Sequence, residues 1–223
     1  MQKLHRDEST VDKSQIKKSG IEKPTIAYTI GDKLYLNITD HCTLRCGFCP
    51  KYNGSHQVHD HDLTLERKPN LQEILQAIDA AGDLGQFTEV VFCGFGEPTL
   101  RLKELLAVAR HLKIQGARVR LNTDGLASRV HKHNVLPELA QCIDAISISM
   151  NAQNETLYNR HCRPSLPDSY QAMLDFLRQA PQYIKDVTAT AIDGLDGVDI
   201  QQCAAIAREL KVKFRRRVLD VVG

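Results

Sequence analysis

Polar and apolar residues alternate in two short runs near residue 30, and this pattern indicates strands. The runs cover 25–30 and 33–38 and flank Gly31-Asp32. Successive side chains of a strand point to opposite faces, so alternation is typical of a strand with one buried face. A two-residue turn that contains glycine joins two such strands into a hairpin. We therefore expect a β-hairpin whose second strand leads into residue 42.

From residue 71 onward, helical stripes alternate with short apolar runs. Leu71, Ile74, Leu75 and Ile78 lie at the spacing of one helix face, and Asn70 can cap that helix. The pattern predicts helices at 71–84, 100–115, 135–142, 154–160, 169–179 and 199–210, and strands at 89–93, 118–122, 145–150, 187–192 and 212–218. Such alternation favours parallel strands with right-handed crossovers and helices outside. We predict an α/β fold, a partial (β/α)6 barrel of the TIM type that follows the hairpin.

Two segments lack this periodicity. Residues 1–24 are polar and charged, which predicts a flexible tail ahead of a single domain at 25–223. Residues 51–69 form a long polar stretch that contains His56, His59 and His61. Such a stretch is typical of a solvated loop, and its imidazoles leave a metal site as the alternative.

The composition is that of a soluble globular protein, with 42% hydrophobic and 25% charged residues among 223. The net charge of +2 implies no strong overall attraction to nucleic acid. No apolar run approaches a membrane span, and the polar N-terminus lacks the apolar core of a signal peptide. We therefore expect a cytoplasmic protein with no membrane partner. The clustered cysteines suit metal ligation better than disulfide bonds, which agrees with a reducing compartment.

Three of the seven cysteines follow the predicted first barrel strand at the spacing C-x3-C-x2-C; they are Cys42, Cys46 and Cys49. Zinc sites usually present C-x2-C pairs and four ligands, whereas three thiolates on one loop suit an iron–sulfur cluster. A 4Fe-4S cubane cluster has one more iron than this loop has cysteines, so one iron is left open to another ligand. A chance group of thiols in a reduced protein is the alternative.

A second motif, Cys93-Gly94-Phe95-Gly96-Glu97-Pro98, follows the next predicted strand. Together with Phe48, the aromatic residue before the third cysteine, the two motifs resemble those of the radical S-adenosylmethionine (SAM) superfamily. The stretches 122–125, 147–152 and 158–164 resemble a small group of radical SAM proteins associated with TatD-type nucleases. The resemblance covers residues 26–218 and implies an open barrel of the radical SAM type.

This resemblance also implies two cofactors, a 4Fe-4S cluster and SAM. The three clustered cysteines would bind three irons, and the fourth iron would chelate the amino and carboxylate groups of SAM. The turn of Gly94, Gly96, Glu97 and Pro98 would hold the amino group of SAM, and Phe48 would lie near the adenine. A turn with an exposed glutamate is the alternative for Glu97.

Further candidates for contact with SAM lie at the ends of later strands, because barrels of this type carry their chemistry at the C-terminal ends of the strands. They are Asn122, Thr123, Ser147, Ser149, Asn151 and Ile192. Ser147, Ser149 and Asn151 alternate along one strand and therefore share a face. Packing with internal hydrogen bonds is the alternative for Ser147.

Cys162 is the candidate catalytic thiol, as a hydrogen-atom donor or substrate contact. It neighbours Arg163, and a nearby cation can lower the pKa of a thiol. Arg163 itself could bind an anionic group of the substrate. Cys142 and Cys203 lie among apolar residues of predicted helices and are expected to be buried thiols. The basic run 211–217 falls on the last strand, where charges discourage edge pairing; contact with RNA is the alternative.

The predicted function is that of a radical SAM enzyme. It would cleave SAM reductively to a 5′-deoxyadenosyl radical, which abstracts hydrogen from a small-molecule or nucleotide-like substrate. The expected partners are a reductase such as flavodoxin or ferredoxin and, by the narrower resemblance, a TatD-type nuclease. The alternative is a non-catalytic iron–sulfur electron carrier or sensor, which would need no SAM pocket beside its cluster.

Overall fold

The structure is a computed structural model that describes residues 24–219. One sheet runs through it in the order β1-β2-β5-β6-β7-β8-β9. The strands are β1 (Ala27–Ile30), β2 (Lys33–Leu36), β5 (Glu89–Phe92), β6 (Val119–Thr123), β7 (Ala145–Asn151), β8 (Asp186–Asp193) and β9 (Lys213–Val218). β1 is antiparallel to β2, and each later pair is parallel. This confirms the predicted hairpin and the partial (β/α)6 barrel, which stays open because β1 and β9 are its two edges.

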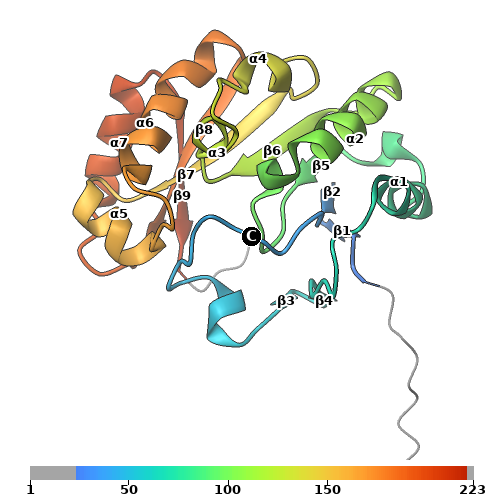
Figure 1. The fold of residues 1–223 in the computed structure, drawn as a ribbon, viewed down its shortest axis with the longest axis horizontal. Coiled ribbons are helices and arrows are strands. Elements are labelled where there is room, and N and C mark those ends of the chain that lie inside the picture. Colours follow the sequence, from blue (N-terminus) through green and yellow to red (C-terminus); the bar gives the residue numbers. More distant parts are fainter. Residues whose placement is uncertain (1–23, 220–223) are drawn as a thin grey trace, which may run out of the picture.

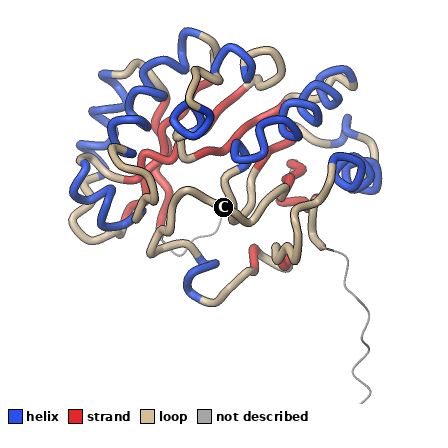
Figure 2. The backbone as a smooth tube through the Cα atoms, viewed as in Figure 1, coloured by secondary structure: helices blue, strands red, loops and turns tan. Residues whose placement is uncertain are grey.

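Helices cover the outer face of the curved sheet, as Figures 1 and 2 show. They are α1 (Leu71–Ala80), α2 (Leu102–Ile114), α3 (Ala127–His131), α4 (Leu136–Leu139), α5 (Glu155–Cys162), α6 (Ser169–Gln179) and α7 (Ile200–Glu209). Short 3-10 helices are η2 (Pro50–Asn53), η3 (Leu84–Gln86), η4 (Pro98–Arg101) and η5 (Ala180–Gln182). Each crossover from one parallel strand to the next therefore carries helix on the same side of the sheet.

The hydrophobic core lies between the sheet and these helices. The strand side chains that point outward are almost all apolar, and Leu34, Phe92, Leu121 and Ile146 are fully buried there. The alternate side chains point into the barrel and include many polar and charged groups. The apolar face of each strand therefore points outward to the helices, and the face that lines the barrel lumen is the more polar one.

Several predicted boundaries are wrong. The stretch 51–69 is not a plain loop, because β3 (Gln57–Val58) and β4 (His61–Asp62) pair in it as a small hairpin. The helix predicted at 71–84 ends at Ala80, shortly before Gly82 turns left-handed with φ +100°. The helix predicted at 135–142 shrinks to α4, and α3 was not predicted. The tail predicted at 1–24 lies outside the described residues except for Pro24.

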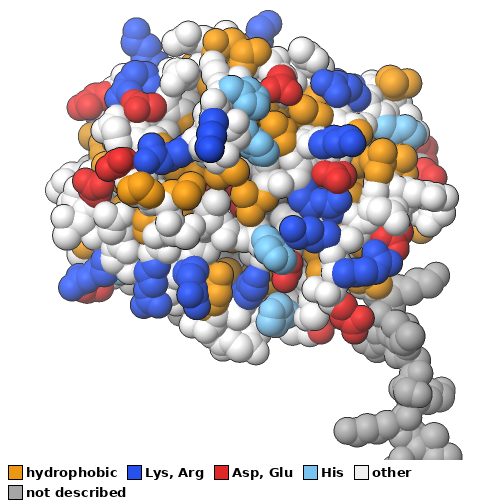
Figure 3. All heavy atoms as spheres, viewed as in Figure 1, with side chains coloured by type: hydrophobic (Ala, Val, Ile, Leu, Met, Phe, Trp, Pro, Cys, Tyr) orange, Lys and Arg blue, Asp and Glu red, His pale blue; other side chains and the backbone are white. Residues whose placement is uncertain are grey.

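No helix within residues 24–219 combines the length and the apolar character that a membrane crossing requires. In the view of Figure 3, Lys and Arg side chains are interspersed with Asp, Glu and hydrophobic side chains, so this face carries no continuous basic patch.

Candidate functional site

A cavity of about 640 Å³ occupies the barrel lumen and is lined by residues from both ends of the strands, including the loops that follow their C-terminal ends. Its volume suits a small-molecule site. Most of the predicted site residues line it: Cys42, Cys46, Phe48, Cys49, Gly94, Gly96, Glu97, Asn122, Thr123, Ser147, Ser149, Asn151 and Ile192. Pro98 and Cys162 do not line it. The structure thus brings together segments that are up to about 150 residues apart in the sequence.

The loop from Cys42 to Cys49 is held by distant parts of the chain. The amides of Arg45 and Gly47 donate to the carbonyls of Cys162 and His161, at 3.0 and 2.9 Å. Leu44 also pairs with Pro164 as an isolated antiparallel bridge. The segment that follows α5 therefore forms a short brace along the cysteine loop.

All three thiols of this loop are half-buried and face the cavity. Burial raises the pKa of Cys42 and of Cys49, and a hydrogen bond with Cys162, followed by burial, raises that of Cys46. Without a metal the thiols would therefore stay protonated, and a bound iron would supply the charge that stabilises the thiolates.

Within the described part of the chain, no three His, Cys, Asp or Glu side chains stand close enough to hold a single metal ion. A cubane cluster places each thiolate on a different iron, so its ligands lie farther apart than those of a single zinc ion. The three thiols lie on one loop and line the same cavity, which suits such a cluster. The histidines of 51–69 have other contacts: His61 packs on Tyr28, and His56 lies edge-on to Phe95.

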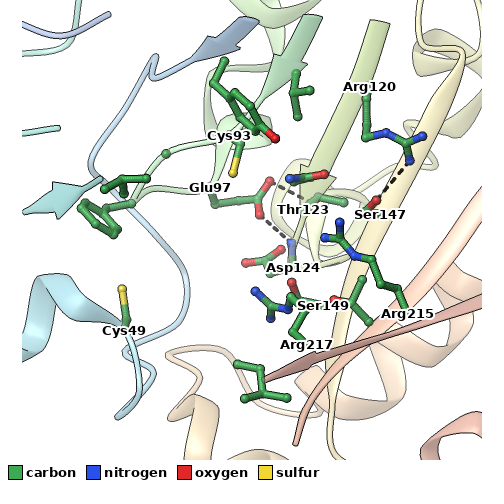
Figure 4. A pocket seen from close by; sticks show the side chains of 18 of the residues that line it. Cys49, Cys93, Glu97, Arg120, Thr123, Asp124, Ser147, Ser149, Arg215 and Arg217 are labelled. Atoms are coloured by element: carbon green, nitrogen blue, oxygen red, sulfur yellow. Dashed lines mark hydrogen bonds between the residues drawn. The ribbon is translucent and has the colours of Figure 1, made fainter. Parts of the chain in front are cut away.

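Glu97 is a buried hydrogen-bonding centre. Its carboxylate accepts from the amide and hydroxyl of Thr99 at 3.0 and 2.7 Å, from the hydroxyl of Thr123 at 2.9 Å and from the amide of Asp124 at 2.7 Å. Asp124 in turn accepts from the hydroxyl of Thr43 in the cysteine loop. Burial, and then the neighbouring Asp124, raise the pKa of Glu97 to about 8. The carboxylate therefore ties η4 to the end of β6, where Figure 4 shows its bonds to Thr123 and Asp124, and Asp124 extends the connection to the cysteine loop.

The two glycines of the turn serve close packing. A Cβ on Gly96 would lie 2.2 Å from the carbonyl oxygen of Thr39, and one on Gly94 would lie 2.3 Å from Oδ1 of Asn37. Neither glycine has a positive φ, contrary to the freedom that a glycine-rich turn suggests. They allow the turn to lie directly against the chain that leads into Cys42, where the Glu97 amide donates to the carbonyl of His41 at 2.7 Å.

Polar side chains of neighbouring strands form rows across the lumen. Ser147 is in register with Asn122 and Thr188, and Ser149 with Thr190. Ser147 accepts a hydrogen bond from Arg120 at 3.2 Å, so part of its predicted alternative, internal hydrogen bonding, is present. The Oδ1 atom of Asn122 is buried without a donor in the described structure. A buried acceptor of this kind is expected to meet a ligand.

The remaining cysteines divide into two groups. Cys142 and Cys203 are buried among apolar residues, as expected. Cys162 is also fully buried, and its thiol lies against Cys46 and against the Asn151 amide, at 3.5 Å from its nitrogen. It supports the cysteine loop from behind, so direct contact with a substrate in the cavity would require α5 to move. Arg163, which ends α5, is exposed and does not line the cavity.

Sequence reasoning missed several lining residues, among them a group of charged side chains. Arg120, Lys213, Arg215 and Arg217 all face the lumen. The basic run was predicted to lie on an edge strand, and β9 is an edge of the sheet; every second basic residue of this strand also lines the lumen, which was not predicted. The alternation of Lys213, Arg215 and Arg217 was the available signal; it could not say which face was the lumen, because the other face of β9 is also partly charged.

The chain belongs to the radical SAM superfamily, whose family model matches residues 36–210. Proteins of this superfamily bind a 4Fe-4S cluster and SAM, which confirms the predicted class and cofactors. The narrower resemblance to TatD-associated proteins stays a prediction.

Curated relatives agree with this class. The chain is 23% identical to a GTP 3′,8-cyclase of Thermodesulfovibrio yellowstonii, over 82% of this chain and 55% of that protein. It is 29% identical to a tungsten-containing aldehyde ferredoxin oxidoreductase cofactor-modifying protein of Pyrococcus furiosus, over 53% of this chain and 30% of that protein. The chain thus matches about half or less of the length of these relatives.

Solved structures share the fold. Streptococcus suis SuiB bound to SAM superposes with a TM-score of 0.60 at 16% identity, over 85% of this chain and 39% of that one. A radical SAM methyltransferase from Sphaerobacter thermophilus gives 0.56 at 16% identity, over 88% of this chain and 69% of that one. At these identities the likeness concerns the barrel and not the substrate.

Proposed function

We propose that this protein is a radical SAM enzyme in which Cys42, Cys46 and Cys49 bind the 4Fe-4S cluster. The observation that carries the proposal is the shared cavity: the three thiols, the Gly94–Glu97 turn and the polar ends of β6 to β8 all line it. When bound, the cluster and SAM supply a one-electron reductive cleavage that gives methionine and a 5′-deoxyadenosyl radical, which takes a hydrogen atom from the substrate.

The residues of the chain would bind and orient SAM beside the cluster. Asn122, with its unpartnered buried oxygen, and Ser149 and Asn151 on the next strand offer polar groups for the ribose and carboxylate of SAM. Phe48 offers an apolar surface for the adenine at the cysteine loop. The enclosing barrel keeps water from the reacting atoms.

The amino group of SAM would bind at the turn of Gly94, Gly96, Glu97 and Pro98. The Oε1 atom of Glu97 accepts from three donors and Oε2 from one, the amide of Asp124, so Oε2 keeps a free acceptor position. An ammonium group could bind at Oε2 or replace a hydroxyl donor such as that of Thr99 at Oε1. A charged donor makes a stronger hydrogen bond to a carboxylate than a hydroxyl does.

The substrate class is proposed as small and nucleotide-like. The relative from T. yellowstonii is by name a GTP 3′,8-cyclase, which supports a nucleotide. The electron donor would be a reductase such as flavodoxin or ferredoxin, and the cytoplasm is the compartment that suits a reduced cluster. The alternative function, an electron carrier without SAM, does not account for a cavity of about 640 Å³ beside the thiols.

The test is anaerobic reconstitution followed by reduction in the presence of SAM. We expect a brown protein with about four irons and four sulfides per chain. Chromatography with mass detection should show 5′-deoxyadenosine formed only when reductant and SAM are both present. A colourless protein with stoichiometric zinc would refute the assignment. A brown protein that never cleaves SAM would support the electron carrier.

A further inference from the structure

We propose that Arg215 and Arg217 of β9, with the hydroxyl groups of Ser149 and Thr190, form a subsite for a phosphate-type oxyanion of the substrate. The proposal deepens the proposed function, on which it rests, by naming a chemical feature of the molecule that the enzyme acts on.

The geometry of β9 separates its basic side chains into two sets. Alternate residues of a strand point to opposite faces. Lys213, Arg215 and Arg217 line the cavity, whereas Phe214 packs on the core outside the barrel. Arg216 is exposed and forms an ion pair with Asp193. The inward set therefore lines the lumen, although β9 is also an edge of the sheet.

Arg215 and Arg217 differ from the other basic groups of the lumen in their partners. Arg120 pairs with Glu89 and Asp186, and Lys213 pairs with Asp186. Among residues 24–219, no carboxylate forms an ion pair with Arg215 or Arg217. The other two carboxyls of the cavity, Glu97 and Asp124, accept hydrogen bonds from hydroxyls and amides instead.

The guanidinium group of Arg217 is only partly satisfied. One terminal nitrogen donates to Oδ1 of Asn151 at 3.1 Å, but the buried Nε atom has no acceptor in the described structure. Arg215 and Arg217 lie two residues apart on the same face of β9 and both line the cavity, and burial, followed by the positive charge of Arg215, lowers the pKa of Arg217. Arg215 is exposed and Arg217 is half-buried, so solvent partly screens their repulsion; an anion bound between them would offset both charges and could use the free donor of Arg217.

The neighbouring strands complete the donor set. Arg215 is in register with Thr190 on β8, which is in register with Ser149 on β7. All three side chains line the cavity, and no hydrogen bond within residues 24–219 occupies either hydroxyl. In Figure 4, Arg215 and Arg217 reach toward the region of Ser149. Two planar guanidinium groups and two hydroxyl groups offer enough donors for a phosphate dianion, which they match better than they match a single carboxylate.

The experiment measures the binding of inorganic phosphate by calorimetry to the anaerobically reconstituted protein, at constant ionic strength set with chloride. We expect one phosphate per chain. Arg215→Gln and Arg217→Gln should each weaken binding about tenfold or more, since a charge-assisted hydrogen bond is lost. The matched control is Arg216→Gln, which removes the same charge from the outer face and should change the affinity by less than about twofold. Phosphate should also raise the Tm of the wild type but not that of the double variant.

Three results would overturn the subsite. The first is that the wild type binds no phosphate. The second is that Arg216→Gln weakens phosphate binding as much as Arg215→Gln and Arg217→Gln do. The third is that these two inner variants lose more SAM affinity than phosphate affinity. The last result would assign the arginines to the carboxylate of SAM. Formation of 5′-deoxyadenosine, measured on the same samples without substrate, tests the proposed function separately. Absence of cleavage would refute that function and leave a positive phosphate result standing.

Discussion

At the N-terminal ends of the barrel strands, Glu89 and Asp186 form ion pairs with a cluster of basic side chains; these are Lys33, Arg118, Arg120 and Lys213. At the C-terminal ends, Asn122 and Arg217 keep buried polar atoms without partners. Both ends belong to one lumen, but the first is closed by ion pairs and the second is left incomplete. The first end stabilises the barrel, and the second is arranged for ligands. Substitutions at the cysteine loop, Glu89, Glu97 and Cys162 test this difference.

The largest effect is expected at the cysteine loop. Replacing Cys42, Cys46 or Cys49 with Ala should abolish the cluster, because each thiolate holds a separate iron. Iron and sulfide content and the visible absorbance measure this. Cys142→Ala and Cys203→Ala are the controls, since both thiols are buried away from the cavity. Loss of the cluster in Cys142→Ala would show that the ligand assignment is wrong.

The next effect concerns the opposite end of the barrel. Burial opposes ionisation of Glu89, but hydrogen bonds from Arg120 and Arg118 outweigh it and lower the pKa of Glu89 to about 2. Glu89→Gln should reduce the free energy of unfolding by about 3 kcal/mol at pH 7, because basic groups lose a buried partner. Urea unfolding measures this. Asp196→Asn, which breaks an exposed pair with Arg160, should cost less than about 1 kcal/mol.

The difference in unfolding free energy between the wild type and Glu89→Gln should depend on pH in a definite direction. The pKa of Glu89 is lower in the folded than in the unfolded protein, so its stabilisation is complete above the ordinary glutamate pKa of 4.5 and is lost as the pH falls toward about 2. The unfolding curves of wild type and Glu89→Gln should therefore converge in acid. Curves that stay equally far apart from pH 7 to pH 2 would show that the ion pairs do not carry the effect.

Glu97 combines features of the ion-paired end and the ligand-binding end of the lumen, because its carboxylate has internal hydrogen-bond partners and also lines the cavity. Glu97→Gln should lower the free energy of unfolding by about 1–3 kcal/mol, since one donor of the turn meets an amide group in place of an oxygen. SAM affinity should fall by about tenfold to a hundredfold. Calorimetry with SAM, at equal iron content, separates the two effects. Unchanged affinity with reduced stability would assign the carboxylate to the turn alone.

The smallest effect is expected for Cys162. Cys162→Ala should leave the cluster in place and change the rate of SAM cleavage by less than about twofold, because a buried thiol acts as a small apolar group. The rate of 5′-deoxyadenosine formation measures this. If SAM cleavage continued but the substrate, once identified, was no longer converted, Cys162 would be the hydrogen-atom donor that its sequence context suggested.

Periodicity predicted those elements that have one apolar and one polar face. α6 has the predicted bounds, 169–179, because Tyr170, Met173, Phe176 and Leu177 form an unbroken stripe. α3 was missed because Ala127 is its one buried residue. In the site, the cysteines and the glycine-rich turn could be found because their spacing is local. The inward direction of Arg215 and Arg217 could not, since it depends on how the sheet curves and not on the residues beside them.

The brace along the cysteine loop has a consequence for the order of events during folding. The loop bonds to Asp124, 81 positions later, and to Ser165, 122 positions later. Contacts between such distant residues form late, because the intervening chain must first lose its conformational freedom. The loop therefore acquires its shape only after synthesis has passed residue 165. On this argument, cluster insertion would follow the packing of the loop against Asp124 and Ser165 and would not act as a nucleus for folding.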